Sequence, residues 1–347
     1  MAVITVKGAV DKSQLGVVLP HEHLLIDLEL FTAAPLGGES VFYDKLSIEN
    51  LRYVKKDPYS ILDNAKMDSE QTAVQEMLLF KKSGGSTVVD VTLDSIGRDA
   101  AALRRISDKS GVNIIMGCGW YVDKAHPACI GEATESELAA QLLREIEYGA
   151  QDTGIKPGVI GEIGTSAVIT ANEWKCLYSA AAAAKESGLA MHIHTGIYQT
   201  NGTEIADRLI ALGVPPHRIA INHVDVDINI DYIAGLLDKG IFVEFDNFGK
   251  EFYISGGSGT LTGRFAYDLE RAKALAALIK RGYGDRLLIT NDICLKHMLC
   301  SYGGFGYGHI TDNIVPMLKD CGVSDREINS LLVKNPAEFL DIKHITV

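Results

Sequence analysis

Short apolar runs rich in β-branched residues alternate along this chain with longer amphipathic stretches. Such runs are typical of parallel strands that helices cover from outside. The pattern predicts eight strand segments, at residues 15–19 with 24–26, 86–91, 113–117, 159–163, 190–194, 218–222, 241–245 and 286–290. Helical periodicity lies between them, at residues 69–82, 135–148, 171–187, 204–212, 231–239 and 267–281. Several of these stretches end at a glycine, the residue that most readily adopts the left-handed C-cap conformation.

Strict alternation of strand and helix indicates an α/β fold. An open doubly wound sheet carries a glycine-rich turn after its first strand, whereas this chain has Pro-His-Glu-His at residues 20–23. Eight strand–helix repeats therefore favour a (β/α)8 TIM barrel. The 347 residues exceed the roughly 250 of a typical barrel. We assign the excess to long segments at 27–66 and 246–266, which follow strands, and expect residues 1–347 to form a single domain.

Composition narrows the range of partners. The chain has 33 Lys and Arg against 45 Asp and Glu, a formal net charge of -12, which is the wrong sign for nucleic acid or an anionic membrane surface. Its six cysteines include no C-x-x-C pair, and no leader pattern or apolar run of membrane-spanning length is evident. We therefore expect a cytoplasmic enzyme that acts on a small molecule.

Histidines and carboxylates follow five of the predicted strands. The carboxyl ends of the strands form the catalytic face of a barrel. A lone histidine is commonly a hydrogen-bonded core residue, but six candidate ligands at strand ends favour metal binding. Since one tetrahedral zinc needs fewer ligands, the set suits two divalent ions that share a carboxylate, with Zn²⁺ favoured and Mn²⁺, Co²⁺ or Fe²⁺ compatible. The six candidates are His21, His23, Glu162, His194, His223 and Asp292.

In their order and at these strand ends, the six residues resemble the phosphotriesterase-related family of the amidohydrolase superfamily. The likeness extends from Leu15-Gly16 to the Asn-Pro-Ala-Glu-Phe-Leu sequence at 335–340. The resemblance implies a binuclear centre, with His21, His23 and Asp292 on the more buried ion and His194 and His223 on the more exposed one. Many members bridge the ions with a carboxylated lysine, whereas this chain has Glu162 there. A homodimer is a further implication.

The same resemblance implies the catalytic groups. A hydroxide that bridges the metals attacks the substrate, and Asp292 accepts its proton and later passes it to the leaving group. Tyr121, after the third strand, is similar to a tyrosine that lactone-hydrolysing relatives place beside the metals. Its alternative role is packing beneath the loop.

Four basic residues near the predicted rim are candidates for binding an anionic substrate group: Lys296, Arg98, Arg264 and Lys250. For Lys296 the alternative is a solvated loop lysine. For Arg98 it is a structural ion pair with Asp94 or Asp99.

Three functions fit this set of residues. The first is a lactonase that opens a sugar lactone, with or without a phosphate. The alternative is an amidohydrolase of N-acyl amino acids or related amides, with phosphotriester cleavage as a side activity. A non-catalytic, metal-bound binding scaffold is the third.

Overall fold

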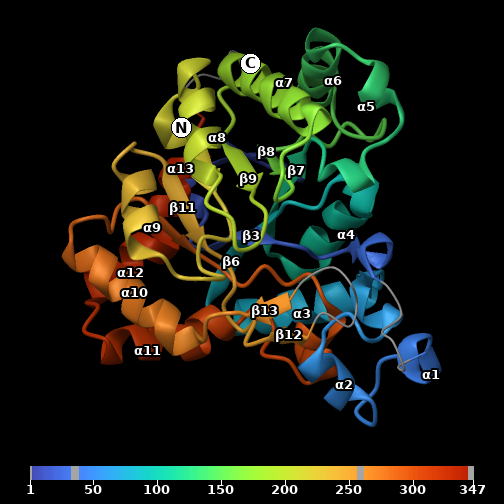
Figure 1. Cartoon of the computed structure of the whole chain (residues 1–347), viewed down its shortest axis with the longest axis vertical. Coiled ribbons are helices and arrows are strands. Elements are labelled where there is room, and N and C mark those ends of the chain that lie inside the picture. The colour runs from blue at the N-terminus through green and yellow to red at the C-terminus, as the bar shows by residue number, and fades with distance from the viewer. Residues whose placement is uncertain (1, 33–38, 256–261, 343–347) are drawn as a thin grey trace.

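An eight-stranded parallel sheet with surrounding helices forms the centre of the computed structural model, which describes residues 2–32, 39–255 and 262–342. Neighbouring strands follow chain order from β3 to β14, and the (β/α)8 barrel predicted from the sequence is confirmed (Figure 1). The strands are β3 (Val17–Glu22), β6 (Gly85–Asp90), β7 (Asn113–Cys118), β8 (Val159–Gly164), β9 (Met191–His194), β10 (Ile219–Ile221), β11 (Phe242–Phe245) and β14 (Leu287–Ile289).

Helices follow the strands, and their ends carry the expected capping residues. Thr134 and Thr170 each accept a hydrogen bond from the third helical residue and form capping boxes at the starts of α6 and α7. Gly188 ends α7 in the left-handed conformation. The α-helices of the described residues are α1 (Glu39–Phe42), α2 (Leu51–Lys56), α3 (Glu70–Lys82), α4 (Ala100–Ser110), α5 (Cys129–Glu132), α6 (Glu135–Tyr148), α7 (Ala171–Ser187), α8 (Gly202–Ala211), α9 (Ile230–Leu237), α10 (Asp268–Lys280), α11 (Val315–Asp320), α12 (Asp325–Asn329) and α13 (Asn335–Leu340).

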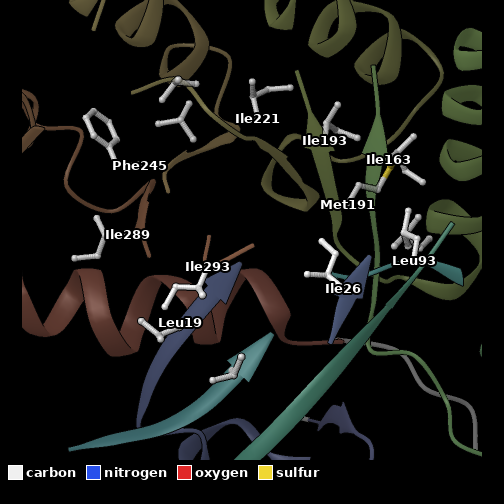
Figure 2. Packing of buried hydrophobic residues seen from close by; sticks show 14 of the residues in the cluster. Leu19, Ile26, Leu93, Ile163, Met191, Ile193, Ile221, Phe245, Ile289 and Ile293 are labelled. Carbon is white, nitrogen blue, oxygen red and sulfur yellow. The ribbon is translucent and has the colours of Figure 1, made fainter. Parts of the chain in front are cut away.

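Alternation along each strand divides the apolar side chains between two clusters. One cluster packs against the helices, and Figure 2 shows its members Ile163 and Ile193 on neighbouring strands. The other fills the barrel interior from alternate strand positions and includes Phe339 of α13. Interior positions nearer the carboxyl ends are polar. The apolar interior therefore supports a polar layer directly above it.

Side chains rather than a backbone ladder join the first and last strands of the sheet. The fully buried carboxylate of Glu22 accepts hydrogen bonds from Thr290 Oγ1 at 2.5 Å and from Asn291 N at 2.9 Å through Oε1. Asn291 Nδ2 donates to the same oxygen at 3.0 Å, and Ile293 N donates to Oε2 at 2.7 Å. Thr290 Oγ1 also contacts the His21 carbonyl at 3.0 Å. We call this joint between β3 and β14 the seam.

The long segments after the first and seventh strands contain short elements of their own. In the first, β4 (Ile26–Asp27) pairs with β5 (Lys66–Met67), and α2 spans Leu51–Lys56. In the second, β12 (Tyr253–Ser255) and β13 (Thr262–Arg264) form an antiparallel pair that contacts α2. Both segments therefore meet on the carboxyl-end face.

The two ends of the described chain are joined at an antiparallel bridge between Ala2 and Ile342. Among the described helices, none combines the length and apolar character needed to cross a bilayer.

Candidate metal centre

All six metal-ligand candidates from the sequence come together at the carboxyl ends of the strands. His21 and Glu162 belong to β3 and β8, and His194 ends β9. The other three lie within three residues of a strand end, His23 after β3, His223 after β10 and Asp292 after β14. Four of the six are buried, whereas His194 and His223 are partly exposed, with 14% and 6% of their side chains accessible. The strand ends thus place an imidazole and carboxylate cluster beneath the loops.

One half of the cluster joins His21, His23 and Asp292. Asp292 Oδ1 lies 3.1 Å from His23 Nε2 and 3.6 Å from His21 Nε2. Glu162 approaches the same pair, with Oε1 3.4 Å from His23 Nε2 and Oε2 3.5 Å from His21 Nε2. These four side chains surround one point.

The other half joins His194 and His223. His194 Nδ1 lies 2.8 Å from His223 Nε2 and 3.1 Å from Glu162 Oε2. His223 Nε2 lies 3.6 Å from the same oxygen. Glu162 therefore stands between the two halves, the position of a bridging carboxylate.

The donor set fits metal ions. Zinc lies about 2.0–2.2 Å from nitrogen and oxygen ligands, so ligands of one tetrahedral ion stand roughly 3.3 Å apart. The distances above match this spacing, and His21, His23 and Asp292 bring one ligand atom each within 4.8 Å of one another. His21 Nε2 is moreover a buried nitrogen without a hydrogen-bond partner. A metal ion would give this imidazole nitrogen the partner that a buried polar atom needs.

Residues beneath the cluster orient its imidazoles. Glu244 Oε2 lies 3.1 Å from His21 Nδ1, and the same oxygen contacts the fully buried His192 at 3.2 Å. Asp246 Oδ1 contacts His223 Nδ1 at 3.0 Å. Such partners fix the ring and its tautomer so that the opposite nitrogen faces the metal. Sequence reasoning missed Glu244 and Asp246. Glu244 carries the signal that identified Glu162, a carboxylate inside an apolar strand.

Mutual electrostatics shift the titration of the cluster. Burial lowers the pKa of His23, but the Asp292 and Glu162 carboxylates outweigh it and raise that pKa to about 10. Burial also lowers the pKa of His223, but the Asp246 carboxylate outweighs it and raises that pKa well above its usual value. Burial, together with the neighbouring His223, lowers the pKa of His194. Since a ligating imidazole must be deprotonated, metal binding at this cluster would release protons.

Two of the candidate ligands adopt strained backbone conformations. His223 and Asp292 have φ angles of 60° and 49°, in the left-handed region that residues other than glycine seldom occupy. Strain of this kind collects at functional sites, where the surrounding structure holds it in place. At both positions it turns a side chain towards the cluster two or three residues after a strand ends.

A cavity of about 80 Å³ opens onto the cluster. Tyr121 lines it, with its hydroxyl 3.4 Å from His194 Nδ1, and burial raises the pKa of this phenol well above its usual value. Lys250 is the one lysine or arginine of the described residues that lines this cavity. It is buried, and its ammonium contacts Asp292 Oδ2. We call this space the metal cavity.

The other three basic candidates lie elsewhere. Lys296 is buried and pairs with Asp63 at 2.9 Å. Arg98 donates to the Gly117 carbonyl at 2.8 Å and contacts Glu145 at 2.6 Å. Arg264 is exposed and pairs with Glu270 at 2.7 Å. None of these three lines the metal cavity in the described part of the chain.

Comparison with known proteins places these features in context. Residues 1–340 match the family model described as "Phosphotriesterase family". The N-acetyltaurine hydrolase of Dictyostelium discoideum is 35% identical over 97% of both chains. The crystal structure of a resiniferatoxin-binding protein from Rhodobacter sphaeroides superposes with a TM-score of 0.95 at 32% identity, covering 99% of this chain and 96% of that one. A mutant of a PTE-like lactonase from Deinococcus radiodurans gives a TM-score of 0.77 at 28% identity, covering 98% and 100%.

Proposed function

The chain belongs to the phosphotriesterase family of metal-dependent hydrolases, and from that premise we propose that it hydrolyses the amide bond of a small N-acyl amino acid or N-acyl aminosulfonate. The comparisons support this alternative better than the lactonase function that the sequence suggested first. Full-length relatives about a third identical carry the name N-acetyltaurine hydrolase. The substrate in that name, N-acetyltaurine, is an amide whose amine part carries a charged sulfonate.

The position of Lys250 in the metal cavity is the observation that supports the proposal most directly. Lys250 is the one lysine or arginine of the described residues that lines the metal cavity. An ammonium has three N–H donors, and Asp292 engages it from one side. The remaining donors can bind a carboxylate or sulfonate of the substrate. The small, partly apolar cavity, with Ile197 and Phe265 in its wall, suits a short acyl group such as acetyl.

Other residues of the chain would bind the metals, transfer the proton and bind the carbonyl oxygen. We assign one divalent ion to His21, His23 and Asp292 and a second to His194 and His223, with Glu162 between them and Zn²⁺ as the favoured metal. Bound here, the ions would supply a nucleophilic hydroxide at neutral pH and polarise the scissile carbonyl. Asp292 accepts a proton and returns it to the amine leaving group. Tyr121, protonated because its pKa is raised, donates a hydrogen bond towards the carbonyl oxygen.

A substrate panel tests the proposal. With metal-loaded enzyme, we expect kcat/KM for N-acetyltaurine or an N-acetyl amino acid to exceed that for sugar lactones, phosphorylated sugar lactones and phosphotriesters. Lactonase activity has support from the structural likeness to a PTE-like lactonase. A clear preference for lactones over every amide would overturn the proposal in favour of that function.

A pair of lysine variants tests the role of Lys250. Lys250→Met should raise KM for the anionic amide at least about tenfold, as loss of a charge-assisted bond predicts, and change KM for an uncharged N-acetyl amide far less. Lys296→Met is the matched control, because Lys296 pairs with Asp63 outside the metal cavity. Metal content is measured for both variants. Equal effects on charged and uncharged amides would contradict the assignment.

A further inference from the structure

A second cavity, of about 300 Å³, lies beside the metal cavity and has no part in the proposed reaction. Its volume is at the lower end of the roughly 300–1,000 Å³ typical of ligand pockets. Phe252 lines both cavities. Lys55, Glu251 and Phe305 are exposed and mark the mouth, whereas Phe248, Ile293 and His297 are buried and form the floor. We call this space the side cavity.

Two chain segments form the wall between the cavities, and their residues face alternate sides. In the segment after β14, Asp292 and Cys294 line the metal cavity, whereas Asn291 and Ile293 line the side cavity. In the segment after β11, Lys250 lines the metal cavity, whereas its neighbours Gly249 and Glu251 line the side cavity. A metal-ligand candidate and its ion-pair partner therefore stand on one face of a wall whose opposite face is open to a ligand.

The side cavity has a definite chemistry. Aromatic rings surround it, with Phe305 stacked on His309 at a centroid distance of 4.2 Å and Phe252 tilted against His297 at 5.4 Å. Asn64 holds His297 through Nδ1 at 2.9 Å, which leaves Nε2 as the ring's remaining polar atom. Burial, with the charge of Lys55, lowers the pKa of His297 to about 4. His297 is therefore a neutral hydrogen-bonding group in an aromatic pocket.

We propose that the side cavity binds a neutral aromatic molecule with one hydrogen-bonding group, of the phenol type, and that its occupant acts on the metal centre through the shared wall. The phenyl rings and Met298 would contact the aromatic body, and His297 Nε2 would bond the polar group. Lys55 and Glu251 at the mouth carry opposite charges and favour no net charge on the ligand. A bound ring restricts Ile293 and Phe252, which preorganises Asp292 and tightens metal binding. This inference does not rest on the substrate proposed above.

Binding is tested with p-cresol as the probe on the metal-loaded enzyme, by calorimetry and saturation-transfer NMR. Phe305→Ala should weaken binding about threefold to tenfold, as expected for an aromatic contact, and should fold normally because Phe305 is 58% exposed. His297→Phe should abolish the preference for p-cresol over toluene. Tyr121→Phe, which alters the metal cavity instead, is the matched control and should leave the affinity unchanged. Absence of binding, or binding that only Tyr121→Phe weakens, would overturn the proposal.

Coupling is tested by chelator competition. Saturating p-cresol should raise the metal affinity about fivefold, and by thermodynamic reciprocity metal loading should raise the affinity for p-cresol by the same factor. Phe305→Ala should reduce the effect in proportion to lost occupancy. Metal affinity that is identical with and without bound p-cresol would refute the coupling.

Discussion

Replacing Glu22 by glutamine should weaken both the fold and the metal centre, because this carboxylate holds the seam between β3 and β14. It is fully buried and accepts four hydrogen bonds. Two of its donors, Asn291 and Ile293, flank the metal-ligand candidate Asp292. In the variant, the amide oxygen can keep the three donors at Oε1. The amide NH₂ then faces the Ile293 N–H, which donated to Oε2 at 2.7 Å.

The expected cost follows from these bonds. Losing one hydrogen bond to a buried charged group costs about 1.5–3 kcal/mol. Three bonds that pass from a charged to a neutral acceptor lose about 1–2 kcal/mol more in total. The free energy of unfolding should therefore fall by about 2.5–5 kcal/mol. At about 2 °C per kcal/mol for a chain of this size, Tm should fall by roughly 5–10 °C.

The assay compares Glu22→Gln with Glu76→Gln, each by thermal melting and by chelator competition for the metals. Glu76 is also a buried carboxylate, and it accepts hydrogen bonds from Ser301 N at 2.9 Å and from Cys300 N at 3.1 Å, away from the metal cavity. Both variants should lose stability, but only Glu22→Gln should also weaken metal binding. A Glu22→Gln protein with unchanged Tm, or with the metal affinity of Glu76→Gln, would refute the role of the seam.

Four further outcomes are expected. Elemental analysis of Glu162→Gln should show that the metal pair is lost, and the wild-type metal centre should assemble without bicarbonate. Two metals retained in the variant would refute the role of Glu162 as the bridging ligand. Asp292→Asn should keep bound metal but lose about 10²–10⁴ in kcat, and near-normal turnover would exclude it as the proton acceptor. Glu244→Gln should lower metal affinity about 10- to 100-fold, because the variant no longer has the carboxylate that orients the His21 ring. An unaltered affinity would show that Glu244 does not orient this ring. The pKa of His297 is about 4 in the folded protein and near 6.5 in the unfolded chain, so the unfolded chain takes up the proton first as pH falls. Up to about 3 kcal/mol of stability should therefore be lost between pH 6.5 and pH 4. His297→Gln should flatten that part of the curve of Tm against pH, and an unchanged slope would contradict the assignment.

The fold and the clustering of the six candidate ligands could be predicted because both depend on local sequence patterns. The alternation of apolar strands and amphipathic helices fixes the order of a barrel, and strand ends bring residues such as His21 and Asp292 together whatever the loops do. Glu162 could be recognised because a carboxylate inside an apolar strand requires a partner.

The substrate side could not be predicted in the same way, because it depends on where long loops fold. Lys296 and Lys250 both lie in segments that follow barrel strands, yet only Lys250 lines the metal cavity. The difference arises from Asp63, which comes from the segment after the first strand and pairs with Lys296 across 233 residues of sequence. Tertiary pairings at such a distance leave no local pattern.

The seam also has a consequence for synthesis on the ribosome. Glu22 and its partner Ile293 are 271 residues apart, and translation at about 5–20 residues per second separates their appearance by roughly 15–50 s. During that interval the first strand has no neighbour on its seam side, and His21 and His23 are displayed without Asp292. Until its last strand emerges, each nascent chain therefore has only part of the candidate metal-ligand set. The seam side of its first strand also stays unpaired. Metal loading and barrel closure are consequently late events in the life of the chain.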